Sequence, residues 1–294
     1  MKHLAILGPG LLGGSLALAM RERTPDCRVT IWARRPEAAE QAGEIADLAS
    51  THLAEVVRGA DTIVFCVPIG AMPALAAQIA PFIEPDALIT DVGSVKAPVV
   101  AALSAIFASR GRYIGSHPMA GSEQTGLSAA RADLFEGSVA LITPHPGVSE
   151  ATQADAAVLW ELLGCKVRTL SPDAHDEAVG LVSHLPHLLA AALVDFIAAQ
   201  NRGAFEVCGN GLRDTTRIAS GSPDMWTEIL AENRAVLSRL LGSWISRLEE
   251  LREVLAGADD AGMKEFLTRA KDSRDQYILK HGSLEDPQSA HHSG

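Results

Sequence analysis

The chain has 294 residues, of which 47% are hydrophobic and 21% charged, a composition typical of folded globular proteins rather than disordered ones. Its net charge of −11 argues against nucleic acid or an anionic membrane as a partner, so an anionic substrate must be attracted by local positive charge. The length favours one large domain or two of moderate size.

The first 23 residues resemble a signal peptide, because a lysine precedes an apolar run. Gly8-Pro9-Gly10 interrupts this run, and strand and helix patterns follow it instead of a cleavage site. No other stretch is expected to reach the ~20 apolar residues that a membrane span requires. The four cysteines form no Cys-x-x-Cys pair, which favours a reducing compartment. The sequence therefore predicts a cytoplasmic protein.

Strand patterns alternate with alanine-rich helical patterns through the first 172 residues. The expected strands are His3–Leu7, 27–33, 61–68, 87–94, 112–117, 138–144 and 166–172. This alternation predicts an α/β domain over 1–172, with a Rossmann-like, doubly wound and mainly parallel sheet. From residue 173 the pattern is almost purely helical, which predicts an all-helical C-terminal domain over 173–280. The turn-rich stretch 281–294 is expected to be a disordered tail.

A Gly-x-Gly-x-x-Gly motif follows the first expected strand and opens a helix, which is the context that dinucleotide binding requires. Gly8 suits a tight turn, Gly10 a close approach to a pyrophosphate, and Gly13 the packing of helix on strand. The helix N-terminus then presents unpaired amides to the phosphates. Leu11 and Leu12 inside the motif are further predicted cofactor contacts, as are Val67 and Pro68 after the strand at 61–68. Without a ligand, the motif would be a plain glycine turn.

The second expected strand ends without the acidic residue that binds the ribose 2′-hydroxyl of NAD. Instead, Ala33 is followed by Arg34 and Arg35, and a guanidinium group suits a 2′-phosphate. The sequence therefore predicts NADP as the cofactor, with NAD less favoured. The alternative is that both arginines are solvated surface charges.

The stretch GSHPMAGSEQTG, residues 115–126, contains His117 and Glu123 in an otherwise turn-forming context. His117 closes an expected strand, and ligands of open α/β sheets lie beyond the carboxyl ends of the strands. A neutral imidazole beside a hydride acceptor suits oxidation of an alcohol, with activity lost as the pH falls through a pKa near ~6.5. Taken alone, however, the residue would more often be a structural histidine.

Three further stretches, taken with HPMAGSE from this one, give the pattern a family resemblance. HPMAGSE, DVGSVK (91–96), SHLPH (183–187) and RDTTRIA (213–219), the last followed by Met225-Trp226, together resemble prephenate and arogenate dehydrogenases of tyrosine biosynthesis. The resemblance extends from residue 1 to about 277, and the motifs are specific in combination rather than singly. It implies an oxidative decarboxylation, with prephenate giving 4-hydroxyphenylpyruvate or arogenate giving tyrosine, and no metal.

The resemblance also implies roles for individual residues. His117 resembles the catalytic histidine, and Ser94 the serine that orients it, although Ser94 could instead cap a helix. Arg217 resembles the arginine that binds a substrate carboxylate. The other residues with an implied role at the substrate pocket are Ser183, His187 and Glu123, together with Trp226, which is expected to reach the site of a partner subunit in a homodimer formed through the helical domain.

Two features of the SHLPH segment follow from its residues alone. Pro186 removes a backbone donor and crowds the preceding turn, so a helix should kink there. His184 and His187 have no third ligand at a suitable spacing, which argues against a metal site. Packing within the helix is the favoured interpretation of His184.

Other functions stay open at this point. A 3-hydroxyacid dehydrogenase of the 6-phosphogluconate type would share the architecture, but it normally uses a lysine in the long helix, and SHLPH has none. A non-enzymatic NADP-binding sensor is the second alternative. Between the two substrates, Glu123 and the lack of an amine-binding acid in SHLPH favour prephenate, whereas the NADP signature favours arogenate.

Overall fold

The computed structural model describes residues 1–108, 112–121 and 124–281. Glu123 and residues 282–294 of the expected tail therefore lie outside the described residues. The chain forms two compact units, Met1–Leu237 and Ser238–Gly294, and the first carries all the candidate site residues that the structure describes. The functional division at residue 172 stays a prediction.

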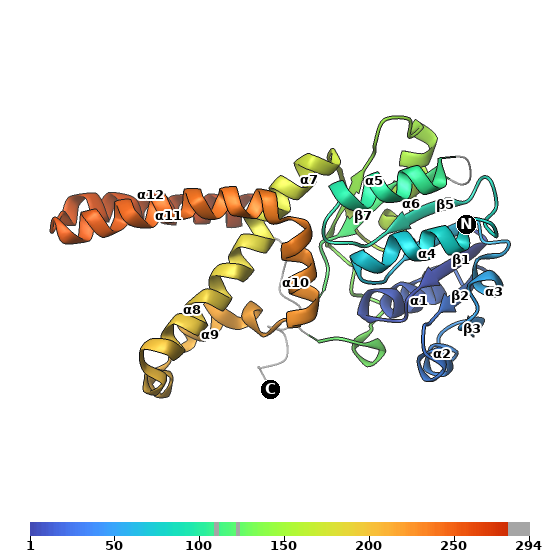
Figure 1. Cartoon of the computed structure of the whole chain (residues 1–294), viewed down its shortest axis with the longest axis horizontal. Helices are drawn as coiled ribbons and strands as arrows, with labels where there is room; N and C mark the ends of the chain where they lie inside the picture. The colour runs from blue at the N-terminus through green and yellow to red at the C-terminus, as the bar shows by residue number, and fades with distance from the viewer. Residues whose placement is uncertain (109–111, 122–123, 282–294) are drawn as a thin grey trace. The chain divides into compact units, whose positions relative to one another are not determined.

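A parallel six-stranded sheet forms the core of the first unit, with the strand order β3-β2-β1-β4-β5-β6 (Figure 1). This is the strand order of doubly wound dinucleotide-binding domains, which confirms the predicted fold class. The strands are β1 (His3–Leu7), β2 (Arg28–Trp32), β3 (Leu48–Ser50), β4 (Thr62–Phe65), β5 (Leu88–Asp91) and β6 (Arg112–Tyr113). β3 was not predicted, because its three residues, Leu-Ala-Ser, are too few to show a periodicity.

A second, three-stranded sheet has the order β7-β8-β9 and comprises β7 (Gly115–Pro118), β8 (Val139–Thr143) and β9 (Lys166–Thr169). The prediction of one strand over 112–117 was wrong, because the chain leaves the first sheet after Ile114, whose amide still bonds to the carbonyl of Ile89. β7 pairs antiparallel with β8, so His117 lies opposite Leu141 inside a strand. It does not sit at the carboxyl end of a parallel strand, as the sequence had suggested.

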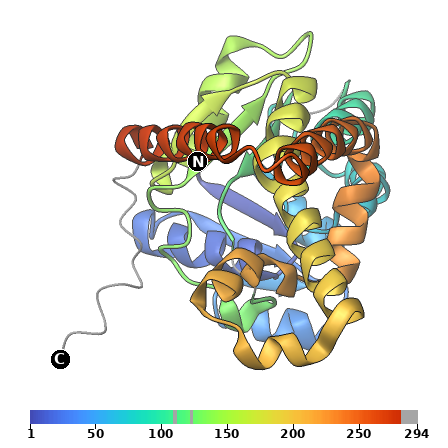
Figure 2. The ribbon, with the colours of Figure 1, turned by 90° about the vertical axis from the view of Figure 1, so that its left-hand side faces the viewer.

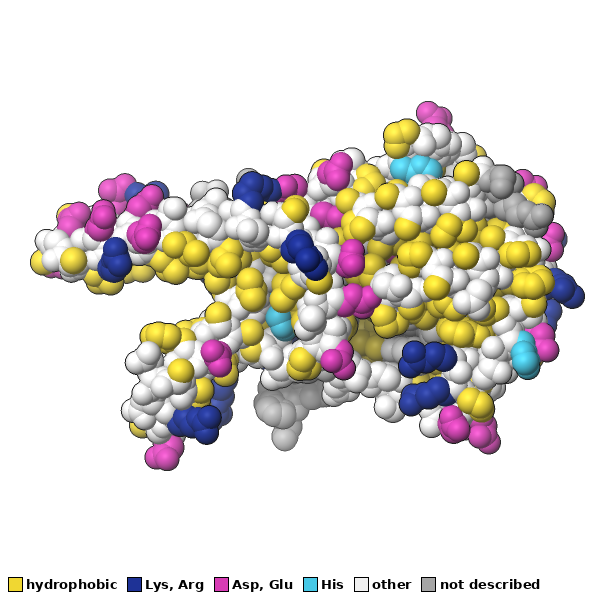
Figure 3. Space-filling model, in the orientation of Figure 1, with side chains coloured by type: hydrophobic (Ala, Val, Ile, Leu, Met, Phe, Trp, Pro, Cys, Tyr) yellow, Lys and Arg dark blue, Asp and Glu magenta, His cyan; other side chains and the backbone are white. Residues whose placement is uncertain are grey.

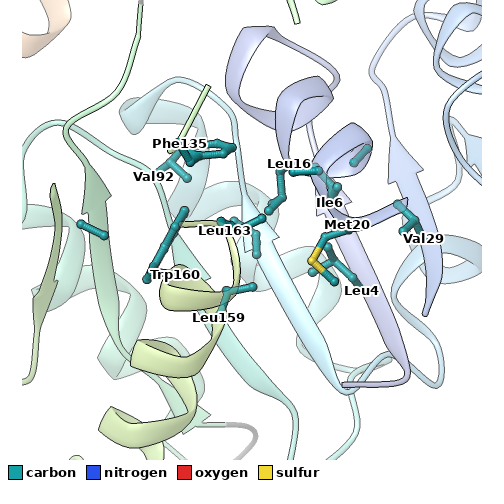
Figure 4. Close-up of a cluster of buried hydrophobic side chains, with 14 of the residues drawn as sticks. Leu4, Ile6, Leu16, Met20, Val29, Val92, Phe135, Leu159, Trp160 and Leu163 are labelled. Atoms are coloured by element: carbon teal, nitrogen blue, oxygen red, sulfur yellow. The ribbon is translucent and has the colours of Figure 1, made fainter. Parts of the chain in front are cut away.

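Helices cover both faces of the first sheet. Leu4 and Ile6 of β1 belong to one hydrophobic cluster with α1 (Leu11–Arg23) and α6 (Glu150–Leu162) (Figure 4). Ala5 and Leu7 point to the other face, where α3 (Leu53–Val57), α4 (Met72–Ile79) and α5 (Ala97–Phe107) pack. This alternation along one strand is expected of a sheet buried on both sides. Three shorter elements lie in the connections: α2 (Pro36–Ala42), η1 (Ile69–Ala71) and η2 (Leu127–Ala129).

The helical part of the first unit begins with α7 and α8, which follow one another as a long interrupted helix (Figures 1 and 2). The interruption is a π-helical turn, Gly180–His184, directly before Pro186 in the first turn of α8. The kink expected at the proline thus takes the form of a widened turn, which is how helices commonly absorb a local defect near a functional site. The elements here are α7 (Pro172–Val179), η3 (Gly180–His184), α8 (Leu185–Asn201), η4 (Arg202–Val207), α9 (Asn210–Thr216), η5 (Arg217–Ser220) and α10 (Pro223–Glu232).

The helical run Pro172–Val207 has the length and hydropathy of a membrane span, with a mean hydropathy of 1.6. The expectation that no stretch would reach these values was therefore wrong. The run nevertheless carries buried side chains of a kind that is costly inside a bilayer, namely His175, Asp176, His184 and His187. Asp176 packs against the N-terminus of α5 and His175 against β7.

The second unit contains most of α11 (Arg234–Ala256) and all of α12 (Asp260–His281). Within it, the Arg247 guanidinium lies 5.3 Å from the centre of the Phe266 ring. Hydrophobic side chains line these two helices in Figure 3, and several are exposed, including Trp244, Ile245 and Leu267. Exposed apolar side chains at this density are typical of an association surface.

Candidate active site

The glycine motif forms a tight connection between β1 and α1. Gly8 has a φ of +116°, and a Cβ on it would lie 2.5 Å from the carbonyl oxygen of Cys66 and 2.9 Å from Val67 Cγ1. A Cβ on Gly13 would lie 1.9 Å from the carbonyl oxygen of Gly8. Glycine is therefore required at both positions, by backbone conformation at the first and by close packing of helix on strand at the second.

The space in front of α1 fits a pyrophosphate. Apart from Gly10 itself and its two chain neighbours, no heavy atom of the described residues lies within 4 Å of an ideal Cβ on Gly10, the residue that precedes the helix. Gly10 has no side chain to cap the helix, and the first turn contains no acidic residue, so the positive end of the helix dipole faces that space. Leu11 and Leu12 pack against the core, while Pro68 is exposed just before η1.

Arg34 and Arg35 follow β2 and are both exposed, whereas Ala33 before them is fully buried. Within the described residues, neither arginine makes an ion pair with an acidic side chain. Arg35 also precedes the short helix α2. The structure thus leaves two guanidinium groups available at the strand end where the adenosine ribose of a dinucleotide lies in this fold.

His117 is held by a chain of hydrogen bonds. Its Nδ1 lies 2.9 Å from Nε2 of His175, and Nδ1 of His175 lies 2.8 Å from Oδ1 of Asp176. All three side chains are buried. Sequence reasoning missed His175 and Asp176, because a His-Asp pair in the first turns of a helix 58 residues further on carries no signal of its own.

Asp176 has a second role at the start of α5. Its Oδ1 accepts a bond from the amide of Lys96 at 2.7 Å, and its Oδ2 accepts one from Ala97 at 2.8 Å. The carboxylate therefore caps α5 from a different element, and the side chain of Ser94 does not cap it. No hydrogen bond joins the described atoms of Ser94 to His117, whose Nδ1 bonds to His175 instead. The orienting role of Ser94 stays a prediction.

A buried ion pair lies next to β7, against the backbone of Ser116. The Lys96 ammonium pairs with Asp91, and both side chains are fully buried. Asp91 also accepts a bond from the Tyr113 hydroxyl at 2.9 Å, and Lys96 donates to the carbonyl of Ser116 at 2.8 Å. Because Ser116 precedes His117, this cluster fixes the backbone that presents the histidine.

The environment of His117 favours a neutral imidazole. Burial lowers its pKa well below 6.5, and the nearby His175, Lys96 and His184 lower it further. Burial also lowers the pKa of His175, against the opposing effect of its bond to Asp176. The expected titration near 6.5 was therefore placed too high, because the sequence does not reveal how deeply the ring is buried.

The SHLPH segment brings a second group of rings together. The His187 ring stacks on Trp226 with centroids 3.5 Å apart and an interplanar angle of 12°, and His184 meets the edge of the same indole. His184 is buried and bonds through Nδ1 to Asn233 at 3.1 Å, and burial lowers its pKa to about 4. Ser183, beside it, is half-buried. In this chain Trp226 therefore contacts its own subunit's histidines, and its expected reach toward a partner's site stays a prediction.

Two contacts connect these rings to the rest of the site. The amide of Gly70, in η1 after Pro68, donates to the carboxylate of Glu228 on α10, the helix that carries Trp226. Arg217 begins η5, which packs against α8, and is exposed. The next loop places Gly221 against both Trp226 and His187. The segment after β4, which contains the predicted cofactor contact Pro68, and the SHLPH segment thus both contact α10. Glu123 lies outside the described residues.

Comparison with known proteins gives matches over most of the chain. Residues 16–169 match the model described as prephenate dehydrogenase, nucleotide-binding domain, and residues 171–269 match prephenate dehydrogenase, dimerization domain. A cyclohexadienyl dehydrogenase of Zymomonas mobilis is 31% identical over 279 residues, covering 93% of this chain and 95% of that protein. A prephenate dehydrogenase of Bacillus subtilis is 32% identical over 289 residues, covering 95% of this chain and 77% of its own length.

A solved structure shows the same arrangement of elements. Prephenate dehydrogenase from Aquifex aeolicus, in complex with hydroxyphenyl propionate and NAD+, superimposes with a TM-score of 0.88 at 29% identity. The match covers 94% of this chain and 98% of the other.

Proposed function

The chain belongs to the prephenate dehydrogenase family, and from this premise we propose that it oxidatively decarboxylates prephenate to 4-hydroxyphenylpyruvate in tyrosine biosynthesis. The alternative substrate is arogenate, which would give tyrosine. The observation that carries the proposal is a buried histidine on β7, whose pKa is lowered well below 6.5 chiefly by burial, in the same compact unit as a dinucleotide-binding glycine loop. Membership of this family decides against the 3-hydroxyacid dehydrogenase and sensor alternatives.

The geometry supports general-base catalysis by His117. When bound, the oxidised nicotinamide cofactor supplies the hydride acceptor. As hydride leaves the carbinol carbon of the substrate ring, neutral His117 accepts the hydroxyl proton at Nε2. The developing ketone withdraws electrons from the bond to the ring carboxylate, which departs as CO2 and leaves a phenolate. The phenolate oxygen then takes back the proton held by His117 to give the phenol. Because this aromatisation drives the step, the protein needs to supply only positioning and a base.

The choice between prephenate and arogenate is tested by one set of assays. Reduction of the cofactor is followed with each substrate and with both NADP and NAD. We expect turnover of at least one cyclohexadienyl acid, with prephenate preferred. Tight cofactor binding without turnover of either acid would contradict the proposed function.

The second family match supports assembly as a homodimer, since residues 171–269 match a dimerization domain. The exposed apolar side chains of α11 and α12 provide a suitable surface. The proposal includes Trp226 reaching the partner's site and a cytoplasmic location, as the relatives are biosynthetic enzymes.

We expect the cofactor to be NADP, preferred over NAD by about tenfold or more in kcat/KM. The reason is that Ala33 leaves out the carboxylate that would repel a 2′-phosphate, while Arg34 and Arg35 offer charge-assisted bonds of about 1.5–3 kcal/mol. Arg34→Ala should remove most of this preference by weakening NADP alone. Ala33→Asp combined with Arg34→Ile should invert it.

Steady-state kinetics with both cofactors at saturating substrate measure this preference. Because Ala33 is fully buried, the thermal stability of the double variant is measured alongside. Equal use of NADP and NAD by the unmodified protein would mean that the two arginines are only solvated surface charges.

Arg217→Lys is expected to raise the KM for the cyclohexadienyl substrate by about tenfold or more. Lysine keeps the charge but loses the two-pronged geometry with which arginine binds a carboxylate. Arg213→Lys is the matched control, because Arg213 is also exposed and lies four residues earlier on α9. Similar KM increases in the two variants would show that the wrong arginine has been assigned to the substrate.

A further inference from the structure

His117 has two ring nitrogens, and only one of them can act as the base. Nδ1 bonds to His175, while Nε2 has no hydrogen-bond partner among the described residues. A neutral imidazole carries its proton on one nitrogen and its lone pair on the other. Catalysis as proposed above requires the lone pair to be on Nε2, so some group must hold the proton on Nδ1.

We propose that His175, itself fixed by Asp176, is a positioning residue that holds His117 in the tautomer with the proton on Nδ1 and the lone pair on Nε2. This inference rests on the proposed function for its catalytic consequence. Its structural content, the tautomer of His117, does not depend on which substrate is used.

Asp176 accepts hydrogen bonds from two backbone amides, those of Lys96 and Ala97, so both of its carboxylate oxygens act as acceptors. An ionised carboxylate has no proton to donate. The contact between Asp176 Oδ1 and His175 Nδ1, at 2.8 Å, therefore requires the proton to be on His175 Nδ1.

The tautomer of His175 then determines that of His117. With its proton on Nδ1, a neutral His175 carries its lone pair on Nε2 and is an acceptor there. The 2.9 Å contact with His117 is then a bond donated by His117 Nδ1–H. His117 Nε2 is left unprotonated, in the form that can take a proton from a substrate hydroxyl. The same logic applies to a catalytic triad, in which a buried aspartate fixes the tautomer of the histidine base.

Burial and the positive charge of Lys96 favour neutral rings, whereas Asp176 and Asp91 favour a charged His175. Lys96 from the loop before α5, His184 from η3 and Asp91 from β5 are the other ionisable groups that act on His117 and His175, in addition to Asp176. Lys96 is bound to Asp91, but it still opposes a positive charge on His117. Burial acts in the same direction for both rings.

This arrangement joins two parts of the chain. His117 lies within residues 16–169, matched by the nucleotide-binding domain, and His175 and Asp176 lie within 171–269, matched by the dimerization domain. The tautomer of the base is therefore controlled by α7, the first helix after the nucleotide-binding region. A shift in the position of α7 would therefore alter the tautomer of His117, and with it kcat, without changing the contacts of the substrate or the cofactor.

The first arm of the test compares substitutions at position 175. His175→Leu removes the acceptor, and kcat is expected to fall about 10²-fold or more, with the KM for the cofactor unchanged. His175→Gln should retain kcat within about tenfold of the unmodified protein, because its side-chain oxygen can accept the bond from His117 Nδ1–H. His3→Leu is the matched control. His3 is also a buried histidine and bonds to Thr30 at 3.0 Å. It lies on β1, a different strand from that of His117, and is far from His117 in the sequence.

The second arm needs no activity. Nitrogen-15 NMR of ring-labelled histidines in the ligand-free protein near neutral pH should show His117 protonated on Nδ1 and unprotonated on Nε2. The signal is assigned by its loss in His117→Asn. This measurement also judges the proposal if His175→Leu does not fold.

Three results would overturn the proposal. The first is His117 with its proton on Nε2 in the NMR spectrum. The second is a folded His175→Leu variant with kcat within about threefold of the unmodified protein. The third is a folded His175→Gln variant with kcat no higher than that of His175→Leu. If the unmodified protein oxidises neither cyclohexadienyl acid, the proposed function fails, while the NMR spectrum still decides whether His175 sets the tautomer.

Discussion

Replacing His117 with asparagine is expected to lower kcat by about 10²–10⁴-fold, the usual contribution of a general base. Asparagine approximates the shape of the ring and can still donate toward His175, but it has no basic nitrogen. Cofactor affinity should be unchanged, because the glycine loop and α1 are separate from β7 in the sequence and in their hydrogen bonds. A variant that keeps a tenth or more of the original kcat would show that another group is the base.

The pH profile of the unmodified protein gives a second view of the same residue. Since the pKa of His117 is lowered well below 6.5, the ring is already neutral at pH values around 6.5 and above. Activity should therefore stay level as the pH falls to 6.5 and decline only at lower pH, as the ring becomes protonated. A decline centred at or above 6.5 would show that the histidine is less buried in solution than in the structure.

Replacing Lys96 with methionine is expected to lower the free energy of unfolding by about 3–5 kcal/mol, the typical cost of breaking a buried ion pair from one side. The ammonium and the Asp91 carboxylate are both fully buried. Without Lys96, the carboxylate would keep its bonds from Tyr113 and the amide of Gly93, but it would have no counter-charge. The carbonyl of Ser116 would also lose its donor.

Urea unfolding, followed by circular dichroism, measures this loss. Lys271→Met is the matched control, because the pair between Lys271 and Asp275 is exposed on α12 and solvent screens such pairs. We expect the control to unfold at nearly the same urea concentration as the unmodified protein. If Lys96→Met costs less than about 1 kcal/mol, the cluster does not anchor the strand that carries His117.

The cofactor half of the site could be predicted from sequence because its signals are local. Gly8, Gly10 and Gly13 fall within six residues, directly after an apolar strand, and the structure shows the close contacts that require glycine at two of them. The main strands were similarly readable, since β-branched runs between helical patterns carry their own periodicity. The fold class followed from that alternation.

The substrate half depends on contacts between distant segments, which no local pattern reveals. The break between β6 and β7 is a single residue, Ile114, inside the stretch RYIGSH, which has no turn signal at that point. His175 reaches His117 across 58 residues, and its neighbour Asp176 caps a helix that begins some 80 residues earlier. The family resemblance assigned the orienting role to Ser94, in the separate motif DVGSVK, whereas the structure pairs His117 with His175, a residue that only folding brings close.

The depth of burial was the other quantity that sequence could not supply. His117, His184 and Lys96 each have a pKa displaced from the ordinary value chiefly by burial. A residue count shows that these groups are present, but only packing shows that water is excluded from them. The expected pH dependence changed chiefly for this reason.

The most direct test of the central claim measures the products of one reaction mixture. Prephenate labelled with carbon-14 in the ring carboxylate is incubated with the protein and NADP, and labelled CO2, reduced cofactor and 4-hydroxyphenylpyruvate are quantified together. Oxidative decarboxylation predicts equal amounts of all three, and loss of all three in parallel with His117→Asn. Reduced cofactor without CO2, or CO2 without reduced cofactor, would contradict the claim that His117 drives both events as one reaction.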